Sequence, residues 1–133
     1  MSQRPFDPIH SDHAPAAIGP YSQAVRAGGL VFLSGQIALV PETMELAGDD
    51  VETQARQVFA NLQAVAEAAG GGLQDLVKLT VYLTDLGNFQ IVNDIMAEHF
   101  REPYPARAAL GISALPRGAK VEVEAVMVAP HPA

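Results

Sequence analysis

The chain has no cysteine and no tryptophan, and it is poor in basic residues. The absence of cysteine excludes a thiol nucleophile, a disulfide framework and a thiolate metal site. Eight Lys and Arg against fifteen Asp and Glu give a formal net charge of -7. This balance repels a phosphate backbone, so we expect no nucleic-acid partner. No segment has the apolar character of a signal peptide or a membrane span, so we expect no membrane association and a cytoplasmic location.

The 133 residues fit one domain of ordinary globular composition, in which 49% of residues are hydrophobic and 17% are charged. Residues 1–13 contain Pro5 and Pro8 and show no apolar period, so they are predicted to form a flexible N-terminal arm. Residues 14–130 are predicted to form the single domain. A lone subunit of this size leaves much apolar surface in water, and a homo-oligomer is therefore the default expectation.

Five segments have the pattern of β-strands. The first two are separated by Gly28-Gly29, a two-residue hairpin signal. In the last segment Lys120, Glu122 and Glu124 alternate with apolar residues, which is typical of a strand with one buried face. The predicted strands cover residues 22–27, 30–37, 76–83, 107–113 and 119–129.

Two segments are predicted to be helices. Over residues 51–69 apolar side chains recur at helical spacing, Asp49 and Glu52 resemble a capping box, and Gly70 suits a left-handed C-terminal position. A shorter helix is predicted to begin at Asn88. The order of elements predicts an α+β fold with both helices on one face of a mixed sheet. The other face is apolar, and we expect it to pack against copies of the chain.

The four histidines are not spaced like metal ligands. None has histidine or carboxylate neighbours at convincing ligand spacing, so we predict that the chain binds no metal, and we expect no cofactor. They are His10 and His13 in the predicted arm, His99 near the end of the second helix, and His131 close to the C-terminus.

Arg107 and Glu122 are the charged residues best suited to chemistry. Arg107 follows the proline-rich residues 103–106 and enters an otherwise apolar strand. It either caps a sheet edge or pairs with a surface acid, or it holds a substrate carboxylate by two parallel hydrogen bonds. Glu122 and Glu124 share one face of the last strand, either on a solvated surface or with one carboxylate in a cleft where it handles protons. Spacing alone leaves both choices open.

Eight short motifs lie between residues 14 and 129. They are residues 14–25 (APAAIGPYSQAV), 34–36 (SGQ), 54–57 (QARQ) with 61–62 (NL), 77–81 (VKLTV), 89–93 (FQIVN), 105–107 (PAR), 115–116 (LP) and 121–125 (VEVEA). In this order and spacing they resemble the RidA family, also called YjgF/YER057c/UK114, the reactive intermediate imine deaminases. Each motif alone is weak, but eight in order are highly specific.

The resemblance implies a chorismate-mutase-like α+β fold and a homotrimer whose sheets pack around a central core, with clefts between neighbouring subunits. It also implies a hydrolase acting on C–N bonds. Such a deaminase converts reactive 2-enamine and 2-imine acids, for example 2-aminoacrylate, to 2-keto acids and ammonia. The implied partner is a small carboxylate substrate, and no cofactor is needed.

The resemblance also assigns roles to particular residues. Arg107 would hold the substrate carboxylate, Glu122 beside it would orient water or shuttle a proton, and Tyr21 would close the cleft. Residue 109 is alanine where many members have cysteine, which removes a thiol contact. The implied lining residues are Ser34, Gly35, Asn93 and Ala109.

Two alternative functions remain at this stage. A pathway-specific deaminase, of the aminomuconate or aminoacrylate type, would share these motifs and differ in the lining around Arg107 and Ala109. A ligand-binding module or a translation inhibitor of the endoribonuclease-like kind would belong to a different class. The net charge of -7 and the lack of a basic stripe argue against RNA as a main partner.

Overall fold

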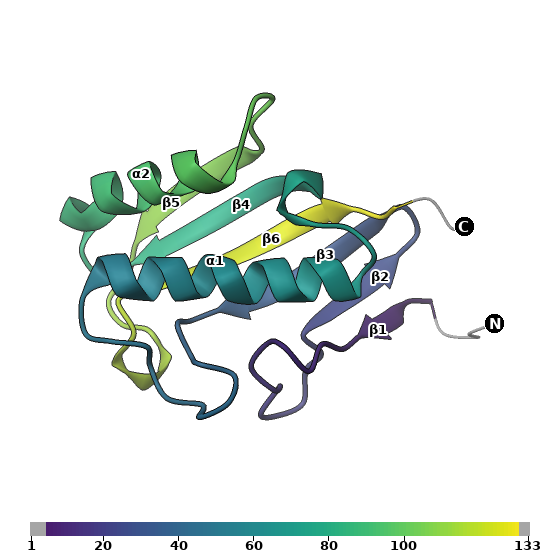
Figure 1. The fold of residues 1–133 in the computed structure, drawn as a ribbon, viewed down its shortest axis with the longest axis horizontal. Helices are drawn as coiled ribbons and strands as arrows, with labels where there is room; N and C mark the ends of the chain where they lie inside the picture. The colour runs from purple at the N-terminus through teal and green to yellow at the C-terminus, as the bar shows by residue number, and fades with distance from the viewer. Residues whose placement is uncertain (1–4, 131–133) are drawn as a thin grey trace.

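The structure, a computed structural model that describes residues 5–130, contains a six-stranded sheet with two helices on one face (Figure 1). The α+β fold with two helices over one face of a mixed sheet is therefore confirmed. His131 lies outside the described residues. The strands are β1 (Asp7–Ile9), β2 (Ala24–Ala27), β3 (Leu30–Gln36), β4 (Leu76–Leu83), β5 (Ala106–Gly111) and β6 (Val121–Val128), and the helices are α1 (Val51–Ala68) and α2 (Phe89–His99).

The strand order across the sheet is β1-β2-β3-β6-β4-β5. The pair β4–β5 is parallel, because α2 carries the chain back to the edge of the sheet at which β4 begins. The other neighbouring strands are antiparallel. The β2–β3 hairpin turns at Gly28, whose φ is 61°, as the hairpin prediction requires. In consequence β5 is an edge strand, and β4 separates it from β6.

Helix α1 has the buried stripe that the sequence predicts. The Asp50 carboxylate accepts a hydrogen bond from the Thr53 backbone N–H at 2.9 Å, so the capping residue is Asp50 rather than Asp49. Gly70 follows the helix with a φ of 94°. Burying each large side chain of the stripe stabilises the fold by about 1.5–3 kcal/mol. Its fully buried large side chains are Val58, Phe59, Leu62 and Val65.

The segment predicted as a flexible arm is partly built into the sheet. Asp7–Ile9 forms strand β1 and pairs with β2, so the prediction of an arm is wrong for these residues. Buried Gln23 then holds the following segment, because its side chain accepts a hydrogen bond from the Ser11 backbone N–H and donates one to the Pro15 carbonyl oxygen. This contact fixes the entry to residues 15–21, which reach the candidate site.

The helices leave the other face of the sheet uncovered. Along β4 the residues Leu79, Val81 and Leu83 are fully buried under the helices, whereas the alternate residues point the opposite way. The uncovered face carries large apolar side chains with nearly half of their surface exposed, namely Phe32 (44%), Leu110 (46%) and Val128 (47%). Such a patch is typical of an interface between subunits. Within residues 5–130 no helix is long and apolar enough to cross a membrane.

Candidate functional site

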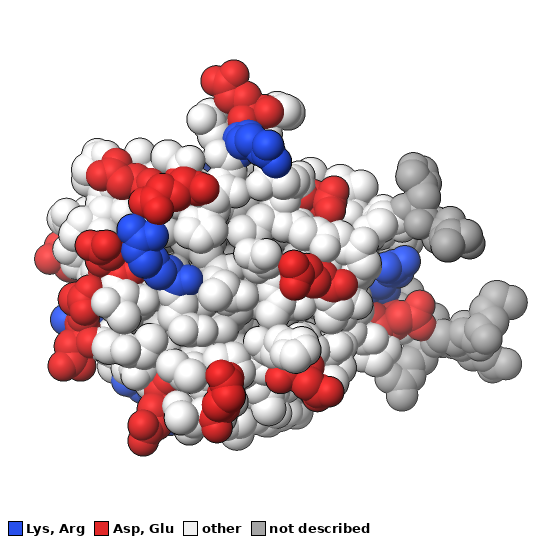
Figure 2. Space-filling model, viewed as in Figure 1, with Lys and Arg blue, Asp and Glu red and all other residues white. Residues whose placement is uncertain are grey.

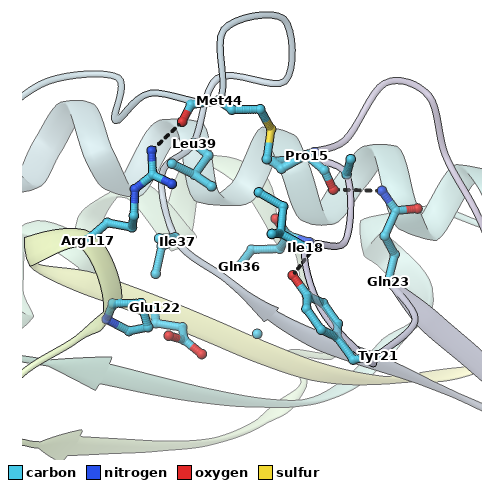
Figure 3. Close-up of a pocket in the computed structure, with 13 residues that line it drawn as sticks. Pro15, Ile18, Tyr21, Gln23, Gln36, Ile37, Leu39, Met44, Arg117 and Glu122 are labelled. Carbon is cyan, nitrogen blue, oxygen red and sulfur yellow. Dashed lines mark hydrogen bonds between the residues drawn. The ribbon is translucent and has the colours of Figure 1, made fainter.

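A cavity of about 410 Å³ opens where strands β3 and β6 meet the segment 15–21 and the connection 116–118. Figure 3 shows the Glu122 carboxylate and the Tyr21 ring facing the same space. Apart from the Glu122 carboxylate, much of the wall is aliphatic. Its aliphatic lining includes Pro15, Ile18, Ile37, Leu39, Met44 and Pro116.

A bulge in β3 brings the backbone close to Glu122. The pairing of β3 with β6 shifts between Leu33 and Gln36, which sets Ser34 and Gly35 out of the regular ladder. A methyl group on Gly35 would overlap the Glu122 carboxylate and lie 2.9 Å from its Cδ. Only glycine therefore allows this approach while the Glu122 side chain keeps this position.

Ser34 is engaged with the backbone of a neighbouring strand. Its hydroxyl donates a hydrogen bond to the Ser22 carbonyl oxygen at 2.7 Å, and its backbone N–H donates to the Gln23 carbonyl oxygen at 2.9 Å. The serine thus pins the bulge to the two residues just before β2. This position gives it a structural role next to the cavity.

The two glutamates of β6 have different surroundings. Glu124 accepts a hydrogen bond from the Tyr82 hydroxyl at 2.8 Å, which is the main reason that the pKa of Tyr82 is raised. Partial burial, and to a lesser extent the nearby Glu124 charge, raise the pKa of Glu122 above its ordinary range. Among the described residues none donates a hydrogen bond to the Glu122 carboxylate, so this group is available for a substrate or water.

Tyr21 lies at the mouth of the cavity. Its side chain and backbone are 54% exposed, and its hydroxyl oxygen lies 3.4 Å from the Ile18 backbone N–H. Gly19 has a φ of 125° and accepts a hydrogen bond from the Tyr21 backbone N–H, which turns the chain so that the ring stands over the opening. A ring held by one weak contact can move to admit a ligand.

Arg107 lies in a second cavity, of about 400 Å³, between β5 and α2. Its Nη1 donates a hydrogen bond to the Asn93 Oδ1 at 2.7 Å and lies 3.7 Å from the Met96 sulfur. The guanidinium also stacks 4.8 Å from the centre of the Phe89 ring. Three side chains of α2 therefore orient it. Two positions further along β5, Ala109 packs against the hydrophobic core.

In one chain Arg107 and Glu122 lie on opposite faces of the sheet. Arg107 pairs in register with Leu79, whose side chain is buried under the helices. Glu122 pairs with Tyr82, which follows Leu79 by three positions on β4. Because successive side chains of a strand alternate between its two faces, Tyr82 and Glu122 point to the uncovered face. The expected arrangement with Glu122 beside Arg107 is thus not formed within a single chain. The structure contains two half-sites: Tyr21, Gly35 and Glu122 in one, and Asn93 and Arg107 in the other.

No group of three potential metal ligands occurs in residues 5–130. His10 contacts Asp12, both on the surface, at 2.8 Å. His99 lies 2.9 Å from the Ile95 carbonyl oxygen through its Nδ1 and stacks on Phe59 with ring centres 5.4 Å apart. These two histidines have structural partners in the described part of the chain.

One charged lining residue was missed from the sequence. Arg117 lies on the wall of the Glu122 cavity, and its guanidinium donates a hydrogen bond to the Met44 carbonyl oxygen at 2.8 Å. In the sequence, Arg117 reads only as part of a turn between two strands. The adjoining Leu115-Pro116 motif was the one signal that this turn belongs to the site.

Comparisons with known proteins identify the class to which this fold and site belong. The family model described as Endoribonuclease L-PSP matches residues 11–129. The crystal structure of RidA from the Antarctic bacterium Psychrobacter is 51% identical, with a TM-score of 0.87, and the match covers 90% of this chain and 97% of that one. The chain therefore belongs to the YjgF/RidA family.

Individual relatives are similar over almost their whole length. Protein DfrA of Myxococcus xanthus is 53% identical over 122 residues, which cover 90% of this chain and 93% of the relative. The 2-iminobutanoate/2-iminopropanoate deaminase of Dermatophagoides farinae is 43% identical over 120 residues, covering 90% and 94%. The named deaminase supports a RidA-type deaminase activity for this chain.

Proposed function

We propose that the protein hydrolyses 2-enamine and 2-imine acids, such as 2-aminoacrylate, to 2-keto acids and ammonia. The observation that carries this proposal is a pair of charged side chains: the guanidinium of Arg107, which α2 holds in one orientation, and the carboxylate of Glu122, which is partly shielded from solvent. The name of the Dermatophagoides farinae relative, a deaminase of small 2-imino acids, supports the same chemistry.

The proposed site is shared between copies of the chain. Arg107 of one subunit and Glu122 of its neighbour would face each other across a cleft, since a single chain holds them on opposite faces. The uncovered apolar face supplies the surface on which such copies would pack. A homotrimer with its sheets around a central core fits this requirement, and every cleft then contains one half-site from each of two subunits.

The carboxylate of the substrate would bind to Arg107. Asn93 and the Met96 sulfur accept the two N–H groups of Nη1, which leaves the N–H groups of Nη2 and Nε for two parallel hydrogen bonds to the ligand. Asn93 in this scheme orients the guanidinium and does not itself contact the substrate. Phe89 and Met96 limit its rotation from the other side.

Glu122 would handle the protons. An enamine first tautomerises to the imine, and water then adds to the carbon of the C=N bond while Glu122 accepts one of its protons. The protonated carboxyl returns this proton to the nitrogen, which completes the carbinolamine. Glu122 then accepts the hydroxyl proton of the carbinolamine and delivers it to the nitrogen, so that the C–N bond breaks and ammonia and the keto acid are released. The raised pKa of Glu122 brings it nearer to neutral pH, which favours both proton transfers.

An RNA-cleaving function, which the family description names, receives less support from this chain. Acidic side chains are spread over the helix-covered face, with only a few basic ones among them (Figure 2). The net charge of -7 would have to be overcome by a local basic surface for a phosphate backbone to bind.

The deaminase proposal is tested with imines made in situ by a pyridoxal-phosphate-dependent lyase, with keto acid and ammonia release followed over time. Loss of the charged contact in Arg107→Ala would cost about 1.5–3 kcal/mol, or roughly 10- to 150-fold in kcat/KM. Arg101→Ala is the matched control, because Arg101 is an exposed arginine just after α2. Turnover by Arg107→Ala at the wild-type rate would remove the proposed mechanism.

A further inference from the structure

The Glu122 cavity is larger than a three-carbon imino acid requires. Its volume of about 410 Å³ falls in the range of about 300–1,000 Å³ that is usual for ligands of drug size. 2-Aminoacrylate has only a methylene group beyond its reacting carbon. Within one chain, the cavity therefore has room for a longer substrate side chain beside Glu122.

The far end of this cavity carries a guanidinium. Arg117 is the only basic residue on the cavity wall among the described residues. Figure 3 shows it beside Met44 and Leu39, well away from Tyr21 at the mouth. The cavity thus has a carboxylate, Glu122, at its reacting end, aliphatic side chains along its wall, and a cation at its outer end.

The backbone holds Arg117 in an unusual conformation. Its φ is 62°, and that of Met44, whose carbonyl oxygen accepts the Arg117 hydrogen bond, is 59°. Both residues are in the left-handed region, which costs a non-glycine residue stability and often marks a functional site. Two such residues joined by a hydrogen bond of 2.8 Å fix the guanidinium at the far end of the cavity.

The Arg117 guanidinium has donors to spare. One N–H of Nη2 binds the Met44 carbonyl oxygen, and no carboxylate of the described residues forms an ion pair with Arg117. A guanidinium in this state binds a carboxylate through two parallel hydrogen bonds. Of the charges that this chain supplies to the cavity, Glu122 repels an anion and Arg117 attracts one, so a second carboxylate of the ligand is favoured at the Arg117 end.

We propose that Arg117 binds a carboxylate at the end of the substrate side chain, so that the protein prefers dicarboxylic 2-imino acids to apolar ones of similar length. This inference rests on the proposed deaminase function. The carboxylate next to the imine binds Arg107 of the neighbouring subunit, the reacting carbon lies at Glu122, and a short aliphatic chain leads to Arg117. Arg117 is then the residue that determines specificity for the side chain.

The test compares two imines made in situ by amino-acid oxidases, one from glutamate and one from norleucine. We expect the wild-type protein to show the higher kcat/KM on the glutamate-derived imine. Arg117→Gln should lower the ratio of the two kcat/KM values roughly tenfold or more, mainly through KM on the dicarboxylic substrate. Arg117→Lys should restore part of the ratio because it keeps the charge, and Arg101→Gln should leave the ratio unchanged.

A second variant and a binding measurement separate the possible failures. Arg117→Gly relieves the left-handed backbone, so a ratio that falls in this variant too is caused by the missing guanidinium. An equal loss on both imines would assign Arg117 a structural role and overturn the inference alone. If the wild-type protein turns over neither imine, the deaminase proposal fails. The role of Arg117 is then tested by calorimetry with 2-oxoglutarate and 2-oxohexanoate, and binding of the two acids with equal affinity overturns the inference.

Discussion

Mixed assemblies of two impaired variants should recover activity. Arg107→Ala lacks the guanidinium and Glu122→Gln lacks the carboxylate, and each is expected to keep at most about a tenth of the wild-type kcat/KM alone. Because β5 and β6 present these groups on opposite faces of one chain, a complete site needs Arg107 from one subunit and Glu122 from the next. A mixed assembly therefore contains some clefts in which both groups are intact.

The recovered fraction follows from the arrangement of the half-sites. In an equal mixture, half of the subunits still carry Arg107 and the other half still carry Glu122. When subunits assemble at random in a ring, about one cleft in four joins the two intact groups, whatever the number of subunits. We thus expect about a quarter of the wild-type activity per chain.

The assay uses the two variants co-expressed in equal amounts with different epitope tags, purified without selection for either tag so that assemblies of every composition are kept, and tested for keto acid release. Co-precipitation of one tag with the other shows whether the two variants have assembled together. The control is wild-type chain co-expressed with the double variant Arg107→Ala/Glu122→Gln. A shared site predicts about a quarter activity in this control also, whereas a site within one chain predicts about a half.

The refuting result is specific. If the two single variants gain no activity on mixing, although both tags show that they have assembled together, the two half-sites do not combine. The guanidinium and the carboxylate would then serve separate purposes, and the proposed chemistry at their meeting point would be wrong.

Two further predictions concern Glu122. Gly35→Ala should lower kcat/KM, because its methyl group overlaps the Glu122 carboxylate and forces this flexible side chain to turn away. Gly29→Ala, with no atom within 4 Å of the added group, should leave kcat/KM unchanged, and equal effects on kcat/KM at both positions would contradict the close-approach explanation. The raised pKa of Glu122 means that folding favours its protonated form. The wild-type protein should therefore lose stability relative to Glu122→Gln as pH rises through that pKa. A difference in the free energy of unfolding of the two proteins that stays constant between about pH 4 and 8 would contradict this.

The elements with strong local patterns could be predicted from the sequence. Helix α1 has an uninterrupted apolar stripe, and β6 alternates charged and buried residues, so both were located within a few residues. Strand β1 was missed because its three residues, Asp7–Ile9, include a proline and show no alternation. Its pairing with β2 depends on contacts that span the segment between them, including those of Gln23.

The candidate site was predicted in its residues but not in its geometry. Arg107 and Glu122 were selected by residue type and motif. Whether they share a face depends on the registers of β4 with β5 and of β4 with β6, and a shift of one residue in either would reverse the answer. Arg117 was missed because a basic residue in a short connection is ordinary, and its left-handed backbone is not visible in the sequence.

The two half-sites on opposite faces of the sheet leave the proposed enzyme without a working monomer. Its specific activity would follow the fraction of chains that have found partners, and dilution alone would switch it off. A newly made chain would fold completely, with its guanidinium oriented and its carboxylate partly desolvated, and still perform no chemistry until a second copy arrives.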